Sequence, residues 1–140
     1  TLSSSSAASD VYKRQVLSIA ACHQNPQPPQ LRAKAVTVAN NVCVLVQPEG
    51  DEKVAIVKIS EVGNLQNALE KYDINDIAAT SDSCMPTYGY KFEKGHSYNF
   101  TVYLDSDEKR EKAIIPSSRI FSVGFTVRDN NGNTEIFGDN

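Results

Sequence analysis

The chain has 140 residues and a formal net charge of −3, from 14 Lys and Arg against 17 Asp and Glu. This length suits one modest domain with its own hydrophobic core. A nucleic-acid-binding protein would show a basic face or stripe, and a protein held to membranes by charge would show a polybasic segment. The composition argues against both classes.

The first 15 residues are expected to be foreign to the natural protein. Residues 5–15 (SSAASDVYKRQ) resemble the translation of a transposase-type sequencing adapter, and such a long match in register rarely arises by chance. The alternative is a natural Ser-rich N-terminus. Residues 1–15 therefore lie outside the predicted fold.

A lipid-attachment motif follows. The peptide Ile19-Ala20-Ala21-Cys22 resembles a bacterial lipobox, and residues 16–21 would be the end of a signal peptide whose basic start is missing. Cys22 would then carry the lipid and become the first residue of the mature chain. The alternative is a short apolar helix with the cysteine in the core. The apolar run is too short to span a membrane, which takes about 20 residues.

Residues 22–32 are predicted to form a flexible tether behind the lipid, because Pro and Gln at this density stay extended and bury no core. His23 follows the cysteine. By resemblance to enteric sorting rules, a residue other than Asp at this position directs a lipoprotein to the outer membrane. We therefore expect a domain that faces the periplasm, with a net charge of −4 from Cys22 onwards.

The predicted folded domain, residues 33–138, begins with β-strands. Two β-branched runs, 34–39 and 42–47, flank an Asn pair, and Asn tolerates the positive φ angles of a tight hairpin turn. Residues 53–62 continue the period of two. These patterns predict three short strands in succession.

The segment 64–72 is ambiguous. Leu65, Leu69 and Tyr72 recur at helical spacing, and Asn64 suits the N-cap of a short helix. An irregular edge strand followed by a loop is the alternative. The helix is the favoured prediction.

A strand–turn–strand pattern follows at 88–92 and 96–104. The second strand alternates cleanly, with Tyr98 near its start and Gly95 in the preceding turn. This resembles the tyrosine corner of immunoglobulin-like and fibronectin-type sandwiches, in which a Tyr early in a late strand bonds back to the backbone just upstream. The alternative is an ordinary hairpin with a buried aromatic residue.

The last part of the chain reads as a charged loop at 105–111 and two further strands. The strands, 118–128 and 133–137, join through an Asp-Asn-Asn-Gly turn. About seven short strands with frequent turn signals predict an all-β fold. We expect an immunoglobulin-like or fibronectin-like antiparallel β-sandwich.

Cys43 and Cys84 are the two cysteines of the predicted domain. Exported proteins fold in an oxidising compartment, so we expect these cysteines to form a disulfide. Two buried free thiols, common in cytosolic proteins, are the alternative.

The chain offers little for catalysis or metal binding. His23 lies in the tether, and His96 lies in a turn without an obvious orienting partner, so no Ser–His–acid or Cys–His set can be assembled. Residues 129–135 carry oxygen ligands, but the glycine is misplaced for a calcium loop. We expect a non-enzymatic protein with no metal site and no cofactor beyond the N-terminal lipid.

Two acidic segments are candidate partner-binding loops. They supply the candidate contact residues Asp51, Glu52, Asp105, Asp107 and Glu108. Acidic runs are usually solvated turns. The functional alternative is a surface that steers association with a basic site on another protein and plugs it.

One family resemblance is visible in the chain. It is carried by 42–46 (VCVLV), 59–63 (ISEVG) and most densely 84–100 (CMPTYGYKFEKGHSYNF). These segments resemble the type VI secretion immunity periplasmic lipoproteins, a family of small Gram-negative lipoproteins. The resemblance implies export, a lipid on Cys22, a Cys43–Cys84 bridge and binding to a cognate toxin. It carries over no toxin-contact residue.

The expected function is therefore that of a membrane-anchored periplasmic lipoprotein. It would bind a secreted effector and neutralise it by stoichiometric occlusion, with its specificity in loops on a rigid sandwich. Two alternatives stay open. One is a structural or accessory lipoprotein that binds another envelope component or a glycan, and the other is an inhibitor of lysozyme-type enzymes.

Overall fold

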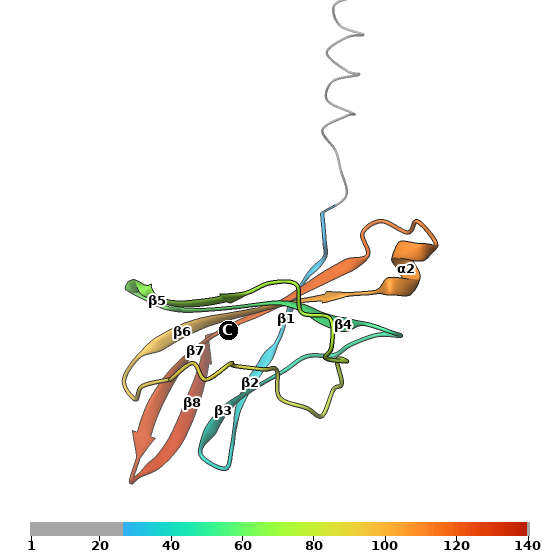
Figure 1. Ribbon diagram of the computed structural model, residues 1–140. Coiled ribbons are helices and arrows are strands. Elements are labelled where there is room, and N and C mark those ends of the chain that lie inside the picture. The colour runs from blue at the N-terminus through green and yellow to red at the C-terminus, as the bar shows by residue number, and fades with distance from the viewer. Residues whose placement is uncertain (1–26, 140) are drawn as a thin grey trace, which may run out of the picture.

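The computed structural model describes residues 27–139. In this range no helix is long and apolar enough to cross a membrane. The predicted adapter-derived segment 1–15, the signal-peptide end 16–21 and the lipid site Cys22 lie outside it. The described elements (Figure 1) are β1 (Gln30–Arg32), β2 (Lys34–Val38), β3 (Asn41–Leu45), β4 (Lys53–Glu61), β5 (Asn64–Lys71), β6 (Ser97–Asp105), α2 (Asp107–Glu111), β7 (Ser118–Asn130) and β8 (Asn133–Asp139).

Six of these strands form one large sheet, and β2 and β3 form a small one. The order in the large sheet is β1-β7-β6-β4-β5, with β8 also paired to β7. One edge of β7 pairs with β6. The other edge pairs first with β1, parallel, at residues 120–122 and then with β8, antiparallel, at residues 124–130.

The prediction of an all-β sandwich is confirmed. The described strands divide six and two between the sheets, whereas a constant-type immunoglobulin domain divides them four and three. Figure 1 shows β2, β3 and the long segment between β5 and β6 along one face of the large sheet. That segment bonds to both sheets, since the Met85 amide donates to the Val44 carbonyl and the Val54 amide donates to the Ile77 carbonyl. The described residues leave the opposite face open.

The core lies between the two layers and follows the predicted period of two in the central strands. In β6, Tyr98, Phe100, Val102 and Leu104 are fully buried, and β7 adds Phe125. Successive side chains of a strand point to opposite faces, so the intervening residues of both strands face outward.

Strand β4 changes face partway along its length. Simple alternation would place Val54 and Ile56 together, but the register with β6 shifts between these two residues. Val54 is buried before the shift, and Val57 and Ile59 are buried after it. A bulge sets two residues opposite one and so reverses which positions face the core.

Tyr98 stands at the centre of the aromatic part of the core. Its ring centroid lies 5.0 Å from that of Phe92, and its hydroxyl accepts a 2.7 Å hydrogen bond from the Glu93 amide just upstream. Gly95 takes a φ of 88° in the intervening turn, and its amide donates to the Val127 carbonyl. The hydrogen bond between the Tyr98 hydroxyl and the Glu93 amide is the backbone contact that a tyrosine corner requires.

The short helix predicted near 64–72 is wrong, because these residues form the edge strand β5 and the start of the next loop. Gly63, at a φ of 83°, turns the chain back along β4. Leu65 is 82% exposed and Tyr72 47% exposed, so their helical spacing corresponds to no shared buried face. Pairing with β4 outweighs the local periodicity.

Three other segments differ from the prediction. Residues 88–92 form a turn and coil instead of a strand, since Tyr88 and Gly89 both take positive φ angles. The last three residues of the predicted tether form β1. The charged loop predicted at 105–111 contains the helical turn α2.

The predicted disulfide is confirmed. Cys43 on β3 and Cys84 are bonded across 41 residues of sequence, with their Cα atoms 5.0 Å apart. Cys43 is buried, whereas Cys84 is exposed. The bond fastens the irregular segment to the small sheet, next to the Met85–Val44 hydrogen bond.

Candidate protein-binding surface

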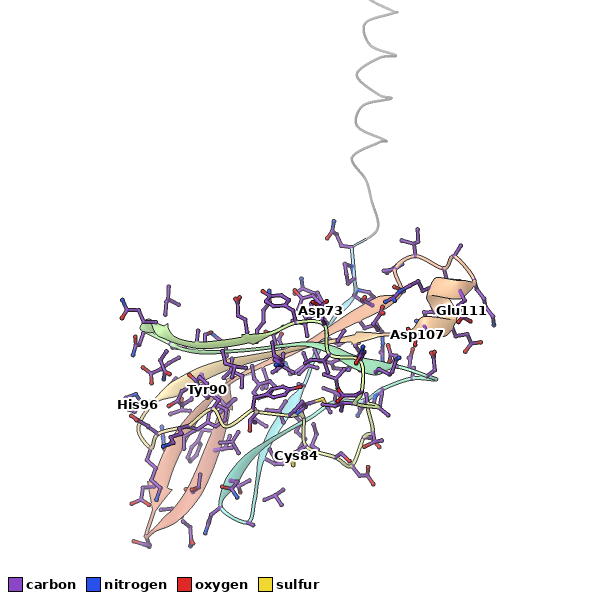
Figure 2. All side chains as sticks on the ribbon, viewed as in Figure 1. Asp73, Cys84, Tyr90, His96, Asp107 and Glu111 are labelled. Atoms are coloured by element: carbon purple, nitrogen blue, oxygen red, sulfur yellow. A yellow bond between two sulfur atoms is a disulfide. The ribbon has the colours of Figure 1, made fainter. Side chains whose placement is uncertain are left out.

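The two predicted acidic loops meet at one end of the sandwich, where Figure 2 shows Asp107 and Glu111 on α2. Asp51, in the turn before β4, joins them. Its carboxylate accepts hydrogen bonds from the Ser106 hydroxyl and from the Glu108 amide, and both bonds hold the pKa of Asp51 below its usual value. We call residues 49–53 and 105–115 the α2 end.

The acidic run folds into a helical turn because Ser106 caps it. The Ser106 hydroxyl accepts a 3.1 Å hydrogen bond from the Lys109 amide. Asp107 and Glu108 lie in the first turn, near the positive end of the helix dipole, and Arg110 lies in the last turn. The turn therefore holds its charged side chains in a defined arrangement.

Two of the five predicted contact residues are structural instead. Glu52 is 3% exposed, and its carboxylate accepts two hydrogen bonds from Arg119, at 2.6 and 2.7 Å. Asp105 is also buried, accepts a hydrogen bond from Ser117 at 2.9 Å and pairs with Arg110. Both carboxylates are satisfied inside the protein, so neither presents a free charge to a partner.

The more exposed predicted contact residues alternate with cations. The Lys53 amine lies 2.5 Å from the Asp107 carboxylate, and the Lys112 amine lies 2.7 Å from the Glu108 carboxylate. The hydrogen bond to Glu108 raises the pKa of Lys112. The α2 end thus presents a pattern of ion pairs instead of a bare acidic patch. Such a pattern favours a partner with the reciprocal arrangement of charges.

Two adjacent isoleucines protrude from this charged surface. Ile115 is 72% exposed and Ile114 is 47% exposed. The Ile114 amide donates a 2.8 Å hydrogen bond to the Lys109 carbonyl, which fixes the chain as it leaves α2. Ile114 also lines a hollow of about 230 Å³, together with mainly polar residues of α2 and of the turn before β4. An apolar centre with a polar rim is the usual anatomy of a protein interface.

These isoleucines were not among the predicted contact residues. Their only signal is an apolar pair placed between a charged run and Pro116, and such a pair equally suits the start of a buried strand. The exposure of both side chains excludes the start of a buried strand. That exposure depends on the direction in which the chain leaves α2, which the sequence does not give.

A protein-family model matches most of the chain. Residues 30–130 match the family model of a domain of unknown function, DUF7480. The chain belongs to this family. No curated protein and no solved structure matches the chain. The matched part of the DUF7480 domain begins with the first residue of β1 and ends with the last residue of β7, so it includes the whole α2 end.

At the other end of the DUF7480 domain, His96 has a partner that the sequence analysis did not find (Figure 2). Its Nδ1 lies 3.0 Å from Glu61 Oε1, and its Nε2 lies 3.6 Å from Glu93 Oε2. The neighbouring Ser97 hydroxyl pairs with Thr126 at 2.7 Å instead of with the imidazole. In the described part of the domain, no group of His, Cys, Asp and Glu is arranged to hold a metal ion.

Proposed function

We propose that this chain is a lipid-anchored periplasmic protein that binds a secreted effector toxin and neutralises it by stoichiometric occlusion. The α2 end is the proposed contact surface. The observation that carries the proposal is the pair of exposed isoleucines set among ion pairs that are fastened to the sandwich. Exposed apolar side chains on a fixed surface suit insertion into an apolar pocket of a partner.

The rigidity of the α2 end supports this role. Asp51 joins the turn before β4 to α2, and Ser106 caps the helix. Arg119 fastens the same turn from β7, through Glu52 and through a 2.9 Å hydrogen bond to the Gln47 carbonyl. A surface that is already ordered loses less conformational entropy on binding, so more of the contact energy appears as affinity.

The proposed location and partner rest on separate observations. The disulfide is typical of proteins that fold in an oxidising compartment, and the lipobox-like peptide ending at Cys22 predicts the anchor. The resemblance to immunity lipoproteins supplies the toxin as partner. The net charge of −4 from Cys22 onwards favours a basic site on that partner.

Replacing Ile115 with Asp is expected to weaken toxin binding by about 30-fold, the effect of losing a hot-spot contact of ~2 kcal/mol. Titration calorimetry with the toxin encoded by the neighbouring gene measures this, after co-purification establishes the complex. The fold is expected to persist, because the side chain is largely exposed. Leu65→Asp is the matched control, since Leu65 is also exposed and lies near Glu61, far along the sheet from α2.

Two results would contradict the proposal at different levels. A neighbouring gene product that is no toxin and does not bind removes the immunity role. Toxin binding that Ile115→Asp and Leu65→Asp leave equally strong removes the α2 end as the contact surface, whatever the protein protects against.

Replacing Cys22 with Ala is expected to abolish the incorporation of labelled palmitate into the protein, because the thiol that would carry the lipid is removed. The gene used must supply a complete signal peptide before Val16, because residues 1–15 are predicted to be foreign to the natural protein. Globomycin, which blocks lipoprotein signal cleavage, is expected to cause a larger precursor of the unaltered protein to accumulate. A Cys22→Ala protein that still incorporates labelled palmitate would argue against a lipid anchor at this residue.

A further inference from the structure

The open face of the large sheet carries a row of mainly uncharged polar side chains. Asn99 and Thr101 on β6, Ser122 on β7 and Gln30 on β1 line a hollow of about 550 Å³, together with the cation Arg32 on β1. Within the described part of the chain, none of these four side chains makes a hydrogen bond. The polar group of each of these side chains can both donate and accept hydrogen bonds, because hydroxyl and carboxamide groups do both. The row therefore offers unused hydrogen-bonding groups to a ligand.

Two tyrosines stand at one end of this row. Tyr103 continues the outward side of β6, and Tyr72 follows the end of β5. The Lys58 amine lies 5.5 Å from the centroid of each ring, and the Tyr72 hydroxyl donates a 2.9 Å hydrogen bond to Glu70. These contacts hold both rings beside a second hollow of about 400 Å³.

The polar row and the tyrosines form one continuous surface. Asn99, Thr101 and Tyr103 occupy successive outward positions on β6, so the row between the first and the last runs for about 13 Å. Figure 2 shows Asp73, which lines the aromatic hollow, on the side of the large sheet away from Cys84. The hollow along the polar row has no lining residue from the α2 end, whereas the aromatic hollow borders that end and is also lined by Lys53, Asp105, Asp107 and Arg110.

We propose that this open face binds a neutral glycan chain, independently of the toxin-binding role. Sugar hydroxyl groups donate and accept hydrogen bonds, as do the side chains of the polar row. The apolar face of a sugar ring matches the flat ring of Tyr103 or Tyr72. Lys58 stands opposite Glu70 across β4 and β5, so the two charges offset each other. A nucleic-acid strand would require a basic stripe instead.

An extended peptide fits this face less well. Peptides that join a sheet add to an exposed edge through main-chain hydrogen bonds. Strands β6 and β7 are paired on both sides along the polar row, so their main chain is not open to a further strand. Apart from Arg32, the outward side chains that line this hollow are uncharged and polar, so they offer hydrogen bonds instead of an apolar pocket for peptide side chains.

Titration of the purified full-length chain with chitohexaose, cellohexaose and maltohexaose tests this proposal. We expect at least one hexasaccharide to bind with a Kd below ~1 mM and to shift the side-chain amide NMR signals of Asn99 and Gln30. Tyr103→Ala is expected to weaken that binding by about tenfold, or ~1.4 kcal/mol. Thr101→Val keeps the side-chain volume but removes the hydroxyl, and a several-fold loss is expected. Tyr103→Phe keeps the ring and is expected to bind almost normally.

The matched control is Tyr88→Ala. Tyr88 is 41% exposed and stacks under Lys71, but it belongs to the segment on the covered side of the large sheet. This variant and Ile115→Asp are both expected to bind the sugar as the unaltered protein does. The proposal is overturned if none of the three sugars shifts any signal at about 10 mM. It is also overturned if folded Tyr103→Ala binds the sugar as tightly as Tyr88→Ala does. A third contradicting result would be amide signals of Asn99 and Gln30 that shift when the toxin is added but not when any of the sugars is added.

Discussion

Replacing Arg119 with Met is expected to lower the free energy of unfolding by about 3–5 kcal/mol, because it leaves a buried charge without its partner. The Glu52 side chain is 1% exposed, and Arg119 supplies two of its hydrogen bonds. Met keeps the aliphatic bulk but has no donor. Urea unfolding followed by far-ultraviolet circular dichroism measures the change in a chain that has no Trp.

The size of this effect is expected to depend on pH. Burial raises the pKa of Glu52, but hydrogen bonds from Arg119 and the Glu49 amide, with the Arg119 charge, outweigh it and bring the pKa below its ordinary 4.5. A carboxyl group whose pKa is lowered by folding stabilises the protein above its unfolded pKa, and this contribution is lost as the pH falls through the folded pKa.

Without Arg119, burial dominates and the pKa of Glu52 is expected to rise above 4.5. The variant then loses stability as the pH rises past that value, because its folded state holds a proton that the unfolded chain releases. The difference between Arg119→Met and the unaltered protein is therefore largest at neutral pH and shrinks in acid.

Two further variants separate the ion pair from general effects of losing an arginine. Arg128→Met removes an exposed arginine stacked on Phe137 and is expected to cost about 1 kcal/mol or less. Adding Glu52→Gln to Arg119→Met removes the buried charge and is expected to restore part of the stability. An Arg119→Met protein as stable as Arg128→Met at neutral pH would contradict the structural role of the pair.

Replacing both Cys43 and Cys84 with Ala is expected to lower the free energy of unfolding by about 4 kcal/mol. The bond closes a loop across 41 residues of sequence, and the chain-entropy model assigns a loop of that length about this much stabilisation. The same loop contains the irregular segment that covers the core beside Met85. Urea unfolding with and without dithiothreitol measures the effect.

The third cysteine supplies the control for the disulfide. Cys22→Ala leaves the Cys43–Cys84 bond in place and is expected to unfold at the same urea concentration as the unaltered chain. Dithiothreitol is expected to lower the midpoint of Cys22→Ala and to leave that of the double variant unchanged. Equal midpoints for all proteins under both conditions would mean that the disulfide does not stabilise the fold.

The fold class was predictable because alternation along a strand is a local property of the sequence. Tyr98, Phe100, Val102 and Leu104 alternate with outward residues, and all four are buried. The disulfide was also predictable, because the predicted domain offers one pair of cysteines. Asn131 and Gly132 lie at positive φ between β7 and β8, as their residue types suggested.

The elements that sequence reasoning missed depend on neighbours that are distant in the chain. Residues 64–72 have helical spacing, yet they pair with β4 because a sheet edge is available there. In β4, the positions that face the core change from even to odd numbers at a bulge opposite β6, and no local pattern in the sequence marks that bulge. Strand β1 adopts a strand conformation only where β7 offers an unpaired edge at residues 120–122.

For the candidate site, the sequence by itself determined which loops carry charge and that two cysteines are available to pair. Only the tertiary structure decided which carboxylates a partner can reach. Glu52 and Asp105 are buried and pair with Arg119 and Arg110, whereas Ile115 is exposed. Charge and spacing are properties of the chain, but burial depends on contacts between β3, β4, α2 and β7. Those contacts exist only once the strands have paired, so the surface that a partner meets is a property of the fold.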